Sequence, residues 1–132
     1  MPGAPISRRR AGFTLIELIV VLAIIALLVS IVAPRYVRTV ENAREASLRT
    51  SLGVMRDAID KYAADKGRYP DSLAELVQRG YMRQIPQDPV TGRQDSWQML
   101  PPAQDNATSG KTADVRSGAA GRGQDGSPYS TW

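Results

Sequence analysis

One carboxylate, that of Glu17, stands near the start of an apolar run that covers residues 13–33. As a helix with a rise of about 1.5 Å per residue, this run would span roughly 31 Å, which matches the hydrocarbon core of a bilayer. A carboxylate at the centre of a bilayer costs about 2.5 to 3.5 kcal/mol, so an acidic residue in such a segment indicates a functional role with a partner. The chemistry that Glu17 offers is charge pairing inside a membrane.

Glu17 also has a local interpretation. Thr14 precedes it by three residues, the spacing of a capping box, in which the threonine hydroxyl caps the helix and the glutamate carboxylate returns to the first turn. Such a cap needs no partner subunit. A helix cap and a partner site are therefore both open interpretations of this residue.

Residues suited to catalysis are missing. The chain contains no cysteine and no histidine, which excludes thiolate catalysis, disulfides, zinc sites built on these residues and a Ser-His-Asp triad. No paired carboxylates lie beside a nucleophile, and the glycines of residues 118–126 are too irregularly spaced for a phosphate-binding loop. The sequence predicts a protein that is not an enzyme and has no catalytic residue.

Positive charge is concentrated before the apolar run. Lys and Arg number 17 against 13 Asp and Glu, and three of the 17 are Arg8, Arg9 and Arg10. Without them the two signs almost balance, so no nucleic-acid partner is expected, whereas positive charge beside an apolar run fixes orientation in a membrane. The run is longer than that of a cleavable secretory signal, and Ile31 and Pro34 do not suit a cleavage site at its end.

A second helical pattern follows Pro34 and predicts an amphipathic helix over residues 35–66, joined to the apolar run and open to a kink at the proline. Gly67 is expected to end it. Apolar or small residues recur at spacings of three and four. They are Val37, Val40, Ala43, Ser47 or Leu48, Leu52, Met55, Ile59 and Tyr62. The later part of this stripe is expected to face a core, and Val37 and Val40 to serve contacts between subunits.

The remaining residues, 67–132, predict a small globular region. Ser72 and Glu75 form a second capping box, which opens a short helix over residues 73–78 that Gly80 ends. Short strands are expected at residues 96–100 and 112–116, with a hairpin-like loop at residues 103–110. Tyr129 and Trp132 suggest a tail that packs back. The predicted fold class is α+β, with a long N-terminal helix, a short second helix and a small antiparallel β region.

The start of the chain resembles the class III signal of type IV pilins and of the pseudopilins of type II secretion. The resemblance rests on a basic leader, Gly12, Phe13, Glu17 four residues later and the long apolar run, with Pro34 near its end as in the family. It implies a leader over residues 1–12, a membrane and assembly helix over residues 13–34, and a prepilin peptidase that cleaves between Gly12 and Phe13 and methylates the new amine. Ala26 departs from the glycine common in relatives.

Cleavage after Gly12 would give Glu17 a partner. The Phe13 amine and the Glu17 carboxylate would then stand one helical turn apart on one face. A neighbouring subunit shifted along the axis could present its amine to this carboxylate, which would favour one register of assembly. The resemblance thus implies that Phe13, Glu17 and Pro34 serve assembly.

Two later passages, at residues 67–70 and 81–89, resemble the major pseudopilins of type II secretion. This implies a structural subunit of the inner membrane, with a single span and a periplasmic C-terminal domain. Such a subunit polymerises with itself into a periplasmic filament that helps export folded proteins, powered by a separate cytoplasmic ATPase. The implied partners are minor pseudopilins, the prepilin peptidase, the inner-membrane assembly platform and the lipid bilayer.

Two other functions stay open. One is a type IV pilin or minor pilin that serves adhesion, motility or DNA uptake, although the missing C-terminal cysteine pair disfavours it. The other is a single-span membrane anchor that presents a small periplasmic binding module and does not assemble.

The resemblance also raises a calcium site near the C-terminus, where major pseudopilins usually have one. Calcium takes six to eight oxygen ligands, generally with several carboxylates. Only Asp114 and Asp125 lie in this stretch, with Ser117 and Ser127 nearby. Aspartates among glycines are more often turn formers. No cofactor is therefore expected, with calcium at Asp114 and Asp125 as the alternative.

Overall fold

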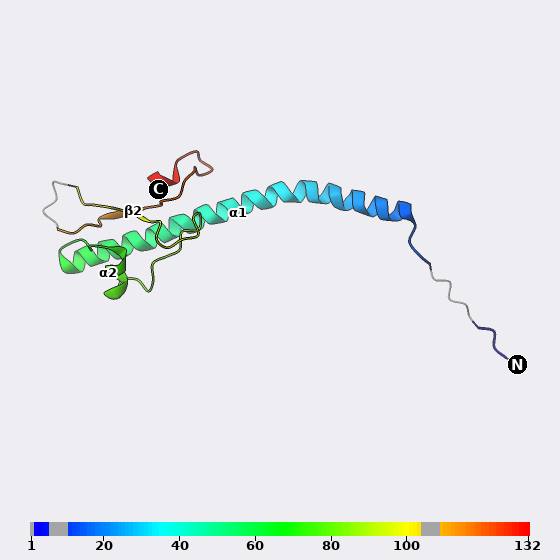
Figure 1. Cartoon of the computed structure of the whole chain (residues 1–132), viewed down its shortest axis with the longest axis horizontal. Helices are drawn as coiled ribbons and strands as arrows, with labels where there is room; N and C mark the ends of the chain where they lie inside the picture. The colour runs from blue at the N-terminus through cyan, green and yellow to red at the C-terminus, as the bar shows by residue number, and fades with distance from the viewer. Residues whose placement is uncertain (1, 6–10, 104–108) are drawn as a thin grey trace. The chain divides into compact units, whose positions relative to one another are not determined.

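The computed structural model describes residues 2–5, 11–103 and 109–132, so Arg8, Arg9 and Arg10 and the middle of the predicted loop at residues 103–110 lie outside the described residues. In chain order its elements are α1 (Leu15–Lys66), α2 (Leu73–Gln78), β1 (Gln98–Leu100), β2 (Asp114–Arg116) and a 3-10 turn at Tyr129–Thr131 (Figure 1). The predicted α+β class is confirmed. The chain divides into two compact units, Met1–Arg38 and Thr39–Trp132.

The first unit contains the apolar part of α1, and its large side chains are exposed all round the helix. Phe13 is 86% exposed, and the aliphatic residues from Leu15 to Val32 are about half exposed or more. This part of the chain is long and apolar enough to cross a membrane. The helix continues through Pro34 without interruption. A helix that is apolar on every side requires a non-aqueous environment.

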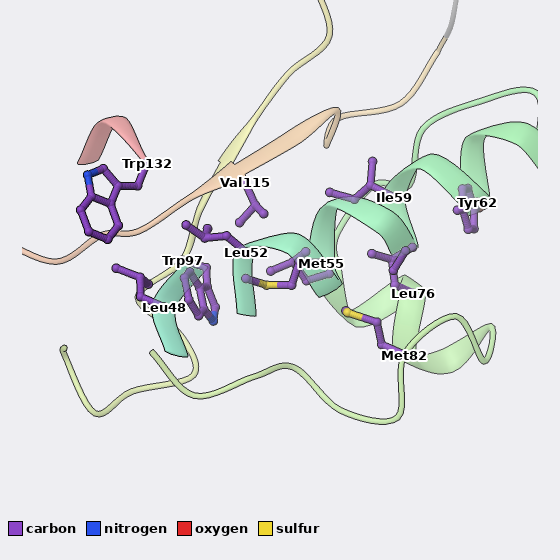
Figure 2. Packing of buried hydrophobic residues seen from close by; sticks show 12 residues of the cluster. Leu48, Leu52, Met55, Ile59, Tyr62, Leu76, Met82, Trp97, Val115 and Trp132 are labelled. Carbon is purple, nitrogen blue, oxygen red and sulfur yellow. The ribbon is translucent and has the colours of Figure 1, made fainter. Parts of the chain in front are cut away.

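The second unit is organised by one face of α1 (Figure 2). Leu48, Leu52, Met55, Ile59 and Tyr62 are at most 1% exposed, and their spacing of three and four places them in one stripe. This confirms the predicted core face. The residues that pack with the stripe come from all later parts of the chain: Leu73, Leu76, Met82, Trp97, Val115 and Trp132.

The predicted stripe does not extend toward the N-terminus of this unit. Ala43 and Ser47 are exposed, Val40 is half-buried, and Val37 in the first unit is exposed. Ala58, which the predicted stripe omitted, is buried beside Ile59. The buried core begins at Leu48, although the end of the chain reaches α1 one turn earlier, at Glu45.

The short helix α2 has the predicted bounds and the predicted cap. Ser72 Oγ accepts a hydrogen bond from the Glu75 backbone N–H at 3.2 Å, and Gly80 follows with a φ of 81°, which favours glycine. The other half of the predicted capping box differs, because the Glu75 carboxylate accepts from the Asp71 N–H at 2.7 Å and not from that of Ser72.

The strands β1 and β2 form one antiparallel pair in which Met99 faces Val115. Each has three residues and is shorter than predicted. Just beyond this pair the two backbones lie close together, since a Cβ at Gly118 would collide with the Ser96 carbonyl oxygen. The predicted return of the tail is confirmed, since Trp132 is only 8% exposed and belongs to the core cluster.

Asp88 is a fully buried carboxylate that connects the loop at residues 88–91 to Ser117, which follows β2. One oxygen accepts hydrogen bonds from the Val90 N–H at 2.8 Å and the Thr91 N–H at 3.3 Å, and the other accepts from Ser117 Oγ at 2.7 Å. These three donors replace the water that the carboxylate loses on burial. Asp88 therefore joins two segments that are distant in sequence.

A second polar cluster joins the end of α1 to α2. Glu75 Oε1 accepts from the Tyr62 hydroxyl at 2.5 Å and from Arg68 Nη2 at 2.7 Å. Together with the bond from the Asp71 N–H, the Tyr62 bond lowers the pKa of Glu75 from its ordinary 4.5 to about 2, and the Arg68 guanidinium adds to this effect. The ionised form of Glu75 is the one that holds α1, α2 and the connection between them together.

Replacing Glu75 with Gln is expected to lower the free energy of unfolding at neutral pH by about 1.5 to 3 kcal/mol, the usual contribution of hydrogen bonds to a charged group. Because the pKa is lower in the folded chain, this stabilisation is complete above pH 4.5 and is lost as the pH falls toward 2. Tryptophan fluorescence during denaturant unfolding, recorded on detergent-solubilised chain across this range, measures it. The wild-type and E75Q curves should converge in acid.

The control is Asp95→Asn, which removes an exposed ion pair to Arg93 at 2.7 Å. Solvent screens an exposed pair of this kind, so D95N should unfold close to wild type. Equal stability of wild type and E75Q at neutral pH would show that the cluster does not stabilise the fold.

Candidate assembly site at the start of the long helix

The capping box at the start of α1 is formed reciprocally. The Thr14 N–H donates to Glu17 Oε2 at 2.9 Å, and the Glu17 N–H donates to Thr14 Oγ1 at 3.3 Å. Both bonds satisfy N–H groups that a helix start leaves without partners. The local interpretation of Glu17 is therefore confirmed.

The cap leaves Glu17 able to bind a further group. Its side chain is exposed and lies in a shallow groove whose other lining residues are Ile16, Val20 and Val21. A carboxylate has two oxygens and about four acceptor positions, of which the Thr14 N–H uses one. The site thus presents one negative charge on an aliphatic surface and can pair with a cation.

The predicted processing residues lie immediately before this site. Gly12 is exposed, and a Cβ built on it would meet nothing within 4 Å. Phe13 is also exposed. The structure thus brings Gly12, Phe13 and Glu17 together at the start of α1, whereas Pro34 lies at the other end of the apolar run.

The two aspartates considered for calcium are held by different partners. Asp114 Oδ1 accepts from Arg56 Nε at 2.8 Å. Asp125 Oδ1 accepts from the Ser127 N–H at 2.9 Å and from the Ser127 hydroxyl at 2.6 Å, and these bonds lower the pKa of Asp125. Within the described residues, no three His, Cys, Asp or Glu side chains are grouped so that they could hold a metal ion. The structure does not bring Asp114 and Asp125 together as one donor set.

Sequence reasoning missed two residues of α1 that contact the end of the chain. Glu45 accepts a hydrogen bond from the Gln124 N–H at 2.7 Å, and Arg49 lies 3.7 Å from an oxygen of Asp125. Their spacing of four places them on one face of α1, beside Leu48 of the core stripe. That spacing could have indicated a shared contact surface, but nothing in the sequence identified the residues that they contact.

The start of the chain matches a known family model. The family model of the prokaryotic N-terminal methylation motif matches residues 7–33, which include Gly12, Phe13 and Glu17. No solved structure matches the chain.

Curated relatives extend the similarity beyond this motif. The type II secretion system core proteins G of Aeromonas hydrophila and Klebsiella pneumoniae are each 33% identical to the chain over 74% of its length, covering 78% and 79% of their own. That of Vibrio cholerae is 30% identical over 89% of the chain and 90% of its own length. The type IV major pilin protein PilA of Myxococcus xanthus is 34% identical, but over only 52% of the chain and 31% of its own length.

The matched methylation motif lies within the first unit, and the similarity to core proteins G extends over most of the second unit. The chain belongs to the family of type II secretion system core protein G.

Proposed function

We propose that the chain is a structural subunit of the type II secretion pseudopilus. The observation that carries this function is the similarity to core proteins G over most of both units, whereas the type IV pilin relative matches about half of the chain. The subunit is held in the inner membrane until it polymerises into a periplasmic filament that helps export folded proteins. Its partners are other copies, minor pseudopilins, the prepilin peptidase and the assembly platform.

Charge and hydropathy support the orientation of this subunit. Arg8, Arg9 and Arg10 precede the apolar run and stay on the cytoplasmic side by the positive-inside rule. The apolar part of α1 spans the bilayer, and the second unit is periplasmic. The prepilin peptidase removes residues 1–12 and methylates the Phe13 amine.

Glu17 sets the register of assembly in this proposal. The exposed aliphatic side chains of α1 supply most of the adhesion between subunits. Because they can pack on a neighbour in many registers, they do not select one register over the others. A single charge pair between Glu17 and the Phe13 amine of a neighbour distinguishes among those registers, since an unpaired carboxylate in lipid is costly. The role of the chain is thus assembly and not catalysis.

Processing between Gly12 and Phe13 can be tested by mutation. Gly12→Val is expected to leave the leader attached, while wild-type chain begins with a methylated Phe13, as intact-mass and N-terminal analysis of membrane-extracted protein would show. The structure provides a matched control in Gly3→Val, because both glycines lie in open space and a side chain at either position disturbs no contact. Wild-type protein that retains Met1 would instead favour a plain membrane anchor.

The assembly role of Glu17 can be tested by removing its carboxylate. Glu17→Ala is expected to leave membrane insertion and cleavage intact and to lower filament yield at least about tenfold, the effect of losing about 1.4 kcal/mol at a contact. Sheared or detergent-released filaments, quantified against total membrane-bound subunit, give the yield.

Thr14→Ala is the control that separates assembly from capping. It removes the N-cap, at a cost of about 1 kcal/mol, and keeps the carboxylate. Filament yield in T14A should remain close to that of wild type. An equal loss in T14A and E17A would mean that Glu17 acts only through the cap, and normal yield from E17A would contradict its role in assembly.

A deletion strain distinguishes a role in secretion from a role in pili. A strain that lacks this chain should fail to release folded exoproteins and should keep its surface fibres. Wild-type chain supplied in trans should restore release, and E17A chain should not. Loss of surface fibres with normal exoprotein release would favour the pilin function.

A further inference from the structure

The C-terminal loop, residues 121–132, lies against α1 through the side chain of Glu45. Glu45 Oε1 accepts hydrogen bonds from the Gln124 N–H at 2.7 Å and from the Tyr129 hydroxyl at 3.4 Å. The first is a charge-assisted bond to the backbone of the loop. One carboxylate thus binds the loop at two points that are five residues apart.

Arg49, one helical turn later, binds the same loop through its guanidinium. The guanidinium carbon lies 3.9 Å from the centre of the Trp132 ring, and Nη2 lies 3.7 Å from Asp125 Oδ2. Tyr129 meets the same tryptophan edge to face at 5.0 Å. Arg49 therefore combines a cation–π contact with an ion pair, and both partners belong to the loop.

The oxygens that a cation could use are already bonded within the loop. Both donors of Ser127 point to Asp125 Oδ1, and Ser127 Oγ accepts from Trp132 Nε1 at 2.6 Å. The Gly126 carbonyl accepts from Arg122 Nη1 at 2.8 Å. Asp125 is the only Asp or Glu of this loop. A calcium ion needs six to eight oxygens and would displace these donors.

Local charge also disfavours a divalent cation. The guanidinium of Arg49 lies beside Asp125, and that of Arg122 is bonded to the Gly126 carbonyl in the same loop. These two positive groups balance the carboxylates of Asp125 and Glu45, so the excess of negative charge that a calcium site requires is missing here. The residues present do not fit the calcium site that is usual for major pseudopilins.

We propose that Glu45 and Arg49 of α1 form a clamp that closes the C-terminal loop, and that this closure requires no divalent cation. The clamp replaces metal coordination with a carboxylate that binds backbone and a guanidinium that binds a ring and a carboxylate. It is independent of the proposed secretion function, because it concerns only how the second unit closes.

Hydrogen exchange with mass spectrometry tests the clamp on the full chain in detergent. Peptides that cover residues 121–132 should exchange at the same rate in excess calcium chloride and in excess chelator. Glu45→Ala and Arg49→Ala should each raise the exchange rate of these peptides by at least about tenfold, because removing the contacts favours local opening. Glu45→Gln keeps an acceptor oxygen and should lie closer to wild type.

Glu41→Ala is the matched control. Glu41 lies one turn before Glu45, and both line a cleft beside the loop, but within the described residues the Glu41 carboxylate accepts no hydrogen bond and forms no ion pair. Its removal should leave exchange in the loop unchanged. Peptides that cover β1 and β2 report whether each variant is otherwise folded.

Two results would overturn the clamp. If chelator accelerates exchange of the wild-type loop, or calcium slows it, a cation closes the loop. If E45A and R49A both exchange at the wild-type rate, the contacts do not hold it.

Discussion

The stripe from Leu48 to Tyr62 on α1 is the constraint on which the second unit depends. Two strands of three residues and one helix of six are too short to be stable alone. α2 and β2 each place an apolar residue on this stripe, Leu76 and Val115, and β1 is paired with β2. The rest of the unit is therefore a covering of one helical face, to which loop residues such as Met82 and Trp97 also contribute.

This dependence explains which features could be predicted from the sequence. The bounds of α2 were predictable because Ser72 and Gly80 act within one turn of it. The core face was predictable from Leu48 onward because helical spacing alone defines it. Ala43 and Ser47 have the same spacing but are exposed, since burial depends on whether a distant segment reaches them. The bond between Asp88 and Ser117 and the contacts of Glu45 depend on the same non-local placement.

The assembly site follows a different logic, because its residues are adjacent in sequence. The capping box draws the Glu17 carboxylate to the Thr14 N–H, which offsets part of the cost of a charge in an apolar segment. Cleavage after Gly12 would leave that N–H in place, so the cap would persist in the processed subunit. A capped carboxylate is tolerable in an isolated subunit and still gains from a neighbouring amine. On the proposed function, the two interpretations of Glu17 therefore become successive states of one side chain.

In the proposed clamp, side chains do what a bound cation would otherwise do at the end of the chain. A divalent cation gathers oxygens from one loop, whereas Glu45 and Arg49 bind the loop directly to the helix that carries the core. Trp132 belongs to the same cluster as Leu48, so closing the loop also covers the N-terminal end of the core stripe (Figure 2). On this proposal the closing groups belong to the chain itself, so the covering of this end of the core would not depend on calcium.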